Sequence, residues 1–206
     1  MKHPERLSTA DKLAVLRQRF KEAAVVKDAG KGYIAVEPFN LVIDPKILQL
    51  ASECWAEHYH GHTTIDAVVG VPDAGSRLVS VLAGMLDVIK ILPSKRAGRL
   101  PGSWQDIVSY SNSSFTTNTE NVISHIGFVK SGDQVLVVDD VVAHGSTAIA
   151  AITALQQAGV QVVGLAVLFS KQWQGGVDKI ERQTGVKVCS LIQVVKLGAD
   201  GQVQLR

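Results

Sequence analysis

Uninterrupted apolar runs alternate with segments of helical periodicity along most of the chain. Four apolar runs predict buried strands, because a strand that is covered on both faces shows no polar alternation. They are residues 65–72, 88–93, 134–142 and 160–169. Helices are predicted at residues 76–86 and 146–158, and Gly159 closes the second one. This order predicts the α/β class, with a mostly parallel central sheet flanked by helices.

The first 60 residues follow a different pattern. Ser8 and Asp11 resemble a helix start, and apolar residues recur at helical spacing as far as Gly30, which predicts an N-terminal helical arm over residues 1–30. The segment YIAVEPF, residues 33–39, alternates like a short strand. Asp44 followed by Pro45 predicts a second helix that runs to about Tyr59.

The regular pattern stops between Pro93 and Gly132. The segment SKRAGRLPGSW is basic and contains glycine, and the segment SYSNSSFTTNTENVISHI that follows is polar and rich in residues that favour strands. A mobile loop that leads into a β-ribbon fits both compositions.

Composition narrows the class of protein. A chain of 206 residues with 46% hydrophobic residues predicts a single domain over residues 1–206. A net charge of +2 argues against a nucleic-acid partner. Apolar runs fall short of the roughly 18 residues of a membrane span, and the widely spaced Cys54 and Cys189 suggest reduced thiols. We therefore expect a cytoplasmic protein without a membrane partner.

Candidate chemistry is concentrated in the segment VLVVDDVVAHGST. Asp139 and Asp140 fall at the carboxyl end of a predicted parallel strand, where open sheets bind ligands. The small and hydroxylated residues 143–147 precede a helix, whose free N–H groups favour a phosphate. Carboxylates repel phosphate, so the acidic pair should face ribose hydroxyls or a divalent metal. An acidic pair at a strand end also occurs in receiver domains and in simple helix caps.

The same segment resembles the signature of type I phosphoribosyltransferases. SFTTNTE and FSKQWQGGVDKI are similar to stretches of bacterial xanthine phosphoribosyltransferases, while SKRAGRLPG and VSYS look like the mobile loop of adenine phosphoribosyltransferases. The resemblance covers about residues 33–200. It implies the type I fold, with a small hood at 33–44 and 171–206 and a mobile loop at about 94–120. It also implies a homodimer that transfers ribose 5-phosphate from phosphoribosyl pyrophosphate (PRPP), with Mg2+ carried by PRPP and no residue assigned to the metal.

The resemblance implies which residues bind PRPP. In the family, the acidic pair holds the ribose, the loop after it holds the 5′-phosphate, and the turn after the first core strand holds pyrophosphate together with the mobile loop. By this resemblance, the catalytic residues are Asp139, Asp140, Lys95 and Arg96. The PRPP-binding residues are Asp139, Asp140, Ala143, His144, Gly145, Ser146, Thr147, Asp73, Ala74, Gly75, Ser76, Arg77 and Arg99.

The base should lie between Phe39, Asn40, Lys171 and Trp173. A lysine ammonium only donates hydrogen bonds, so Lys171 favours xanthine or another oxopurine. Pro72 and Ala74 depart from the purine pattern and look more like orotate-type loops, which leaves adenine and orotate as alternative bases. A PRPP-binding transcriptional regulator without catalysis is a further alternative, but the segment before residue 33 is too short for the winged helix that such regulators carry.

Overall fold

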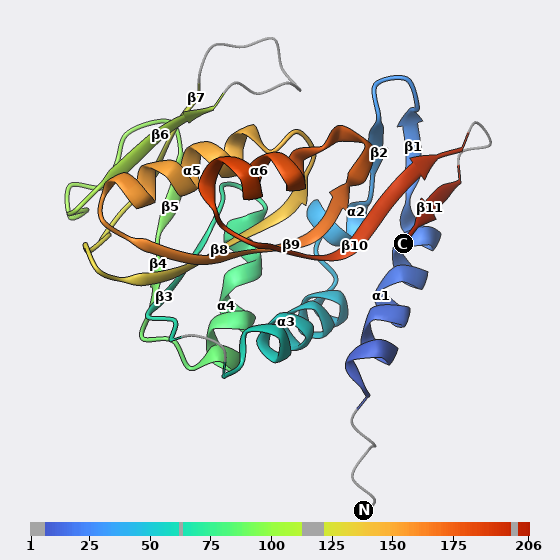
Figure 1. Cartoon of the computed structure of the whole chain (residues 1–206), viewed down its shortest axis with the longest axis horizontal. Helices are drawn as coiled ribbons and strands as arrows, with labels where there is room; N and C mark the ends of the chain where they lie inside the picture. Colours follow the sequence, from blue (N-terminus) through green and yellow to red (C-terminus); the bar gives the residue numbers. More distant parts are fainter. Residues whose placement is uncertain (1–6, 62–63, 113–121, 199–201) are drawn as a thin grey trace, which may run out of the picture.

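A six-stranded sheet forms the centre of the computed structural model, which describes residues 7–61, 64–112, 122–198 and 202–206 (Figure 1). Its strand order is β11-β10-β9-β8-β3-β4, and all neighbours are parallel except β11, which runs antiparallel to β10. The four predicted strands are confirmed, and two more follow at the C-terminal end. The strands are β3 (Ala67–Gly70), β4 (Lys90–Leu92), β8 (Gln134–Val142), β9 (Gln161–Lys171), β10 (Val188–Leu197) and β11 (Val203–Leu205).

Helices cover both faces of the sheet (Figure 1). On one face lie α5 (Ser146–Gln157) and α6 (Gly176–Thr184), and on the other lie α1 (Thr9–Ala23), α3 (Pro45–Tyr59) and α4 (Gly75–Leu86). Successive strand residues alternate between two cores: Val68 and Leu136 pack with α1, α3 and α4, while Val69 and Val135 pack with α5. This double coverage explains why the strands are apolar without alternation, and it confirms the predicted α/β class.

The N-terminal segment differs from its prediction. Ser8 caps α1 as expected, since its Oγ accepts a hydrogen bond from the Asp11 amide at 3.2 Å, but the helix ends at Ala23 and does not reach Gly30. Residues Val25–Asp28 form strand β1, which pairs antiparallel with β2 (Tyr33–Ala35). The two adjacent β-branched valines of β1 favour a strand once a partner is present.

The predicted strand at residues 33–39 is also shorter than expected. It ends at Ala35, and a single helical turn, α2 (Glu37–Asn40), follows with Pro38 in its first turn. Proline suits that position because its φ angle is fixed near the helical value. The helix predicted after Asp44 is confirmed: Asp44 accepts a hydrogen bond from the Lys46 amide at 2.7 Å, and α3 ends at Tyr59.

A small antiparallel sheet lies at one end of the molecule, in the region where a β-ribbon was predicted. It contains β5 (Ser94–Arg96), β7 (Val122–Ile126) and β6 (Val108–Asn112), with β7 in the centre. Residues 113–120 of the predicted mobile loop lie outside the described residues. The short helix η1 (Gln172–Gln174) joins β9 to α6 near the β1-β2 hairpin. Among the described residues, no helix has both the length and the hydrophobicity needed to cross a bilayer.

Candidate active site

A cleft of about 450 Å³ lies at the carboxyl ends of β3 and β8. The chain leaves β3 toward the edge strand β4 and returns to the other side of β3 through β8, so the cleft occupies the point where the strand order reverses. Open α/β sheets bind ligands at such points. Its lining residues are Asn40, Leu41, Val71, Pro72, Asp73, Ala74, Arg77, Arg96, Asp139, Asp140, Val141, Val142, Ala143, His144, Gly145, Ser146, Thr147 and Ala148.

The acidic pair stands on an interior strand of the sheet. Strand β8 pairs with β3 on one side and β9 on the other, and both Asp139 and Asp140 line the cleft. Asp139 is only 7% exposed, and its Oδ1 accepts a hydrogen bond from the Asp140 amide at 2.9 Å. Burial, and next the neighbouring Asp140 carboxylate, raise the pKa of Asp139 well above its usual value. The protein environment of Asp139 therefore disfavours its charged form.

The loop after the acidic pair forms a concave turn of backbone. Gly145 has φ +78°, a left-handed conformation that side chains rarely adopt, and it places Ser146 at the start of α5. The first helical turn is closed by the hydrogen bond from the Ile149 amide to the Gly145 carbonyl at 2.9 Å, and Ser146, Thr147 and Ala148 of this turn line the cleft. Residues 143–147 all line the cleft, as predicted for a phosphate-binding loop.

Helix α6 supports this loop from behind. A Cβ atom on Gly176 would lie 2.2 Å from the Ala143 carbonyl oxygen, so the backbones of the two segments touch. Only glycine allows such an approach, because the obstructing atom belongs to the backbone and cannot turn away. The sequence prediction did not include Gly176, although two adjacent glycines at 175 and 176 mark a close approach or a turn.

The turn after β3 forms the opposite wall. Asp73, Ala74 and Arg77 line the cleft, and so do Val71 and Pro72, which the sequence prediction had left out. Gly75 and Ser76 lie behind the wall. Ser76 Oγ is 2.8 Å from Ser94 Oγ, and Ser94 Oγ donates to the Gly70 carbonyl at 2.5 Å. These hydrogen bonds hold the turn against β5.

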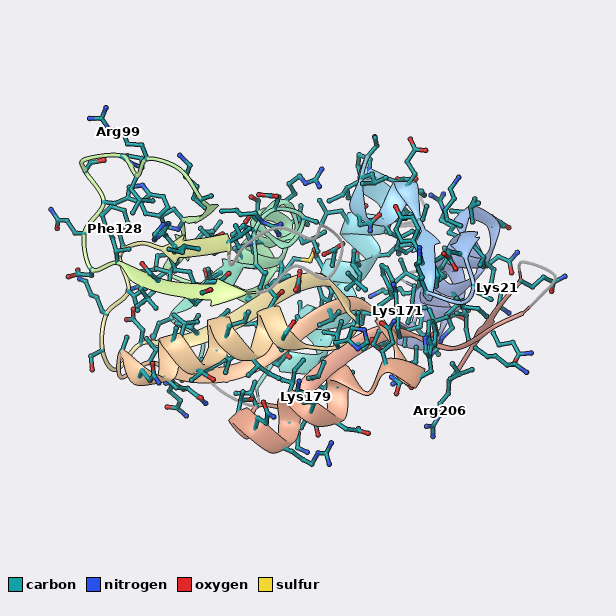
Figure 2. The ribbon with its side chains drawn as sticks, turned by 90° about the horizontal axis from the view of Figure 1, so that it is seen from above. Lys21, Arg99, Phe128, Lys171, Lys179 and Arg206 are labelled. Carbon is teal, nitrogen blue, oxygen red and sulfur yellow. The ribbon has the colours of Figure 1, made fainter. Side chains whose placement is uncertain are left out.

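The basic residues of β5 separate because side chains alternate along a strand. Arg96 lines the cleft, donates from Nη2 to the Pro72 carbonyl at 2.8 Å, and lies 3.5 Å from the Asp73 carboxylate. Lys95 points the other way, and its Nζ donates to the Arg99 carbonyl at 2.8 Å. Arg99 extends outward at the far end of the molecule (Figure 2). Of the three predicted loop cations, only Arg96 reaches the cleft.

The residues predicted to bind the base do not lie together in the structure. Asn40 lines the cleft, and its Oδ1 is buried without a hydrogen-bond partner among the described residues. Phe39, one position earlier, is fully buried and packs edge-on against Phe20 at 5.2 Å, so the structure places it in the core. Leu41, which the prediction omitted, lines the cleft in its place.

Lys171 lies where the C-terminal half of the chain meets the N-terminal hairpin (Figure 2). Its half-buried ammonium donates to the Gly32 carbonyl at 2.9 Å. Burial lowers the pKa of this ammonium, and the Asp140 carboxylate opposes that effect, which places Lys171 within electrostatic reach of the acidic pair. Trp173 remains 40% exposed beside Gly32. Neither Lys171 nor Trp173 is part of the cleft wall.

Comparisons with known proteins agree with this geometry. A family model described as "Phosphoribosyl transferase domain" matches residues 40–201. The adenine phosphoribosyltransferase of Christiangramia forsetii is 29% identical over 86% of this chain and 98% of its own length, and the xanthine phosphoribosyltransferase of Pseudomonas entomophila is 28% identical over 90% and 95%. The crystal structure of the Rhodothermus marinus adenine phosphoribosyltransferase superposes with a TM-score of 0.69 and 28% identity over 88% of this chain and 99% of that one.

The chain belongs to the phosphoribosyltransferase family, of type I. It is an enzyme that transfers a ribose phosphate group from PRPP.

Proposed function

We propose that the enzyme transfers ribose 5-phosphate from PRPP to a purine, with xanthine or another oxopurine preferred, to give the nucleoside 5′-monophosphate and pyrophosphate. The observation that supports the choice of base is two polar groups, Asn40 in the cleft wall and Lys171 outside the cleft lining, beside the β1-β2 hairpin. Asn40 presents a buried acceptor that has no partner in the described part of the chain, and Lys171 presents an ammonium that donates one of its three N–H groups to the Gly32 carbonyl. An oxopurine matches both, since its ring N–H donates and its carbonyl accepts. Adenine has no carbonyl to offer Lys171.

The sugar and phosphate of PRPP fit the continuous segment from Asp139 to Thr147. In this proposal the two carboxylates accept hydrogen bonds from the 2′ and 3′ hydroxyls, while the loop amides, the hydroxyls of Ser146 and Thr147, and His144 surround the 5′-phosphate. A hydrogen bond to a charged group contributes about 1.5 to 3 kcal/mol, so several of them on one phosphate would anchor the substrate. Donors from the ribose would also satisfy the buried carboxylate of Asp139.

The reaction separates charge, and the cleft offers groups of both signs. As the bond from C1′ to pyrophosphate breaks and the base nitrogen attacks C1′, the ribosyl centre becomes positive and the leaving group becomes more negative. The carboxylates of Asp139 and Asp140 would face the ribosyl centre. Arg96 and the backbone of residues 71–74 would face the departing pyrophosphate, with Lys95 and Arg99 available on the same loop.

Magnesium fits this site as a companion of the substrate. Mg2+ usually keeps several waters and is bound through substrate phosphates with one or two carboxylates, and the exposed Asp73 and the half-buried Asp140 are cleft carboxylates that could complete such a set. When bound, the ion would neutralise charge on pyrophosphate. We further propose a homodimer, supported by Leu41 and Val42, which are 59% and 70% exposed beside the cleft. The free thiols Cys54 and Cys189 suit a cytoplasmic enzyme.

Adenine is the alternative base, because relatives with adenine and xanthine in their names match this chain about equally well. The test is a panel of xanthine, guanine, hypoxanthine, adenine and orotate, each supplied with PRPP and Mg2+, with pyrophosphate release as the readout. We expect the highest kcat/KM with an oxopurine. A clear preference for adenine would overturn the choice of base, and an absence of release with every base would overturn the proposed reaction.

A further inference from the structure

Helix α2 is a single turn of four residues that carries Asn40 into the cleft. A helix of this length is not stable by itself, because the cost of fixing its first turn exceeds the gain from one or two hydrogen bonds. It must be held by its surroundings. On its inner side Phe39 is fully buried against Phe20, which fixes the depth of the turn but not the direction of Asn40.

The second contact comes from a residue 36 positions further along the chain. Arg77, in the first turn of α4, donates from Nη1 to the Leu41 carbonyl at 2.7 Å and from Nη2 to the Asn40 carbonyl at 2.9 Å. The last carbonyls of a helix have no partner within it, and a cation at that end is favoured by the helix dipole. Arg77 therefore caps the C-terminal end of α2 with two bonds at once.

The two bonds use the geometry that distinguishes arginine from lysine. A guanidinium holds two N–H donors in one rigid plane, so it can reach two neighbouring carbonyl oxygens, whereas an ammonium is a single compact donor centre. Each terminal nitrogen of Arg77 donates one hydrogen bond to the end of α2, although Arg77 also belongs to the cleft lining. The other arginine of the cleft lining, Arg96, donates from Nη2 to the Pro72 carbonyl, within the turn that we assign to pyrophosphate.

We propose that Arg77 is a positioning residue for the base, which orients Asn40, and that it is not a pyrophosphate ligand. This inference rests on the proposed function, because Asn40 is a base contact only if the base occupies this end of the cleft. It reassigns Arg77, which the family resemblance alone placed among the PRPP-binding residues. Since α4 starts directly after the turn at residues 71–74, Arg77 also connects the pyrophosphate wall to the base wall.

The test separates the affinity for the base from the affinity for PRPP. Arg77→Met removes both donors, and Arg77→Lys keeps the charge but not the paired geometry. The matched control is Arg182→Met, since Arg182 is an exposed arginine that also donates to a helix carbonyl, that of Asp178 at 3.2 Å, outside the cleft. With the base that wild type uses best, both Arg77 variants should raise KM for the base about tenfold. Their KM for PRPP should change less than about twofold, and the control should match wild type.

Two kinetic results would overturn the proposal. If KM for PRPP, or for pyrophosphate in the reverse reaction, rises at least as much as KM for the base, Arg77 is a pyrophosphate ligand. If Arg77→Lys behaves as wild type, charge and not the paired hydrogen bonds is what matters. Because both variants keep an aliphatic stem at an exposed position, circular dichroism should show an intact fold.

A second readout does not depend on activity. The amides of Leu41 and Val42 both donate to the Glu37 carbonyl at 3.0 Å, so hydrogen exchange at these amides reports whether α2 is closed. In Arg77→Met their exchange should be about tenfold faster, with no change in Arg182→Met. Unchanged exchange would refute the cap even if the enzyme proved inactive with every base, and faster exchange in an inactive enzyme would refute only the proposed reaction.

Discussion

The two halves of the cleft are built in opposite ways. The half proposed for ribose 5-phosphate is one continuous segment, residues 139–147, that leaves a central strand and enters α5. The half proposed for the base combines three segments: the turn at Asn40 and Leu41, which lines the cleft, and the hairpin turn at Gly32 and the strand end at Lys171, which lie outside the cleft lining. The first is supported by neighbouring strands on both sides, whereas the second is held by side-chain contacts between remote segments.

This difference suggests why one fold serves several bases. A change in the sugar half would disturb β8 and α5 together, so that half tolerates little variation. The base half can change through single contacts such as those of Arg77 and Lys171 while the sheet stays intact. The comparable similarity of this chain to proteins named for adenine and for xanthine agrees with a shared sugar half and a variable base half.

The strongest test of the sugar half replaces its carboxylates. Asp139→Asn and Asp140→Asn keep size and shape but remove the negative charge proposed to face the ribosyl centre. Loss of one such electrostatic group typically costs 10²-fold to 10³-fold in rate, so each variant should lose at least about 10²-fold in kcat/KM for every base in the panel. The control Asp178→Asn, on the exposed face of α6, should keep wild-type rates. A loss confined to one base would place the carboxylates in the base half and break the comparison.

Gly176→Ala tests whether the phosphate loop depends on its support from α6. The added methyl group would meet the Ala143 carbonyl at 2.2 Å, and overpacking of this kind costs about 1 to 3 kcal/mol. We expect KM for PRPP to rise about tenfold and KM for the base to change much less. In the control, Gly84→Ala within α4, the new methyl group meets nothing within 4 Å and should slightly stabilise the helix. An unchanged KM for PRPP would show that the loop can shift to accommodate the methyl group without losing affinity for PRPP.

The sugar half could be predicted from the sequence, and the reason is local. The apolar run, the acidic pair, Gly145 and the helix start lie within one segment, so local rules predict the observed strand Gln134–Val142 and the helix start at Ser146. Side chains alternate along a strand, so Arg96 lies on the same side of β5 as Ser94, and Lys95 lies on the other side. The sequence could have predicted this difference if the inward direction of Ser94 had been known.

The base half could not be predicted in this way, because its contacts join distant residues. The pairing of Val25 and Val26 with β2 overrides a helical pattern, and Pro38 ends a strand pattern by starting a helical turn. Nothing near Arg77 in the sequence indicates that its partners are the carbonyls of Asn40 and Leu41. Phe39 and Asn40 are adjacent, and only the packed structure shows that one is core and the other lines the cleft.

Lys171→Met sharpens the assignment of the base half. If the ammonium donates to a base carbonyl, its removal should raise KM for an oxopurine about tenfold, leave KM for PRPP nearly unchanged, and affect adenine least. Lys179→Met is the matched control, because Lys179 is an exposed lysine on α6 (Figure 2). Equal losses for the base and for PRPP would remove Lys171 from the base half.

The smallest expected effect concerns stability, and it again separates the halves. Burial and the nearby Asp140 raise the pKa of Asp139, so the folded protein binds this proton more tightly than the unfolded chain does. The stability that this bound proton contributes is therefore present at low pH. It is lost as the pH rises from the ordinary pKa near 3.8 through the raised pKa of Asp139. Asp139→Asn removes that loss and keeps an oxygen to accept from the Asp140 amide.

The variant should equal wild type near pH 4 and become more stable by about 1 kcal/mol, or 2 to 4 °C in Tm, by pH 8. Urea unfolding at both pH values, without PRPP, measures the difference. Lys171→Met, in the base half, is the variant to compare with Asp139→Asn. Burial lowers the pKa of the Lys171 ammonium, and its removal would take a favourable cation away from the Asp140 carboxylate. A stability gain for Asp139→Asn that is equal at both pH values would show that the buried carboxylate is compensated within the protein, and that the sugar half does not disfavour the charge of Asp139.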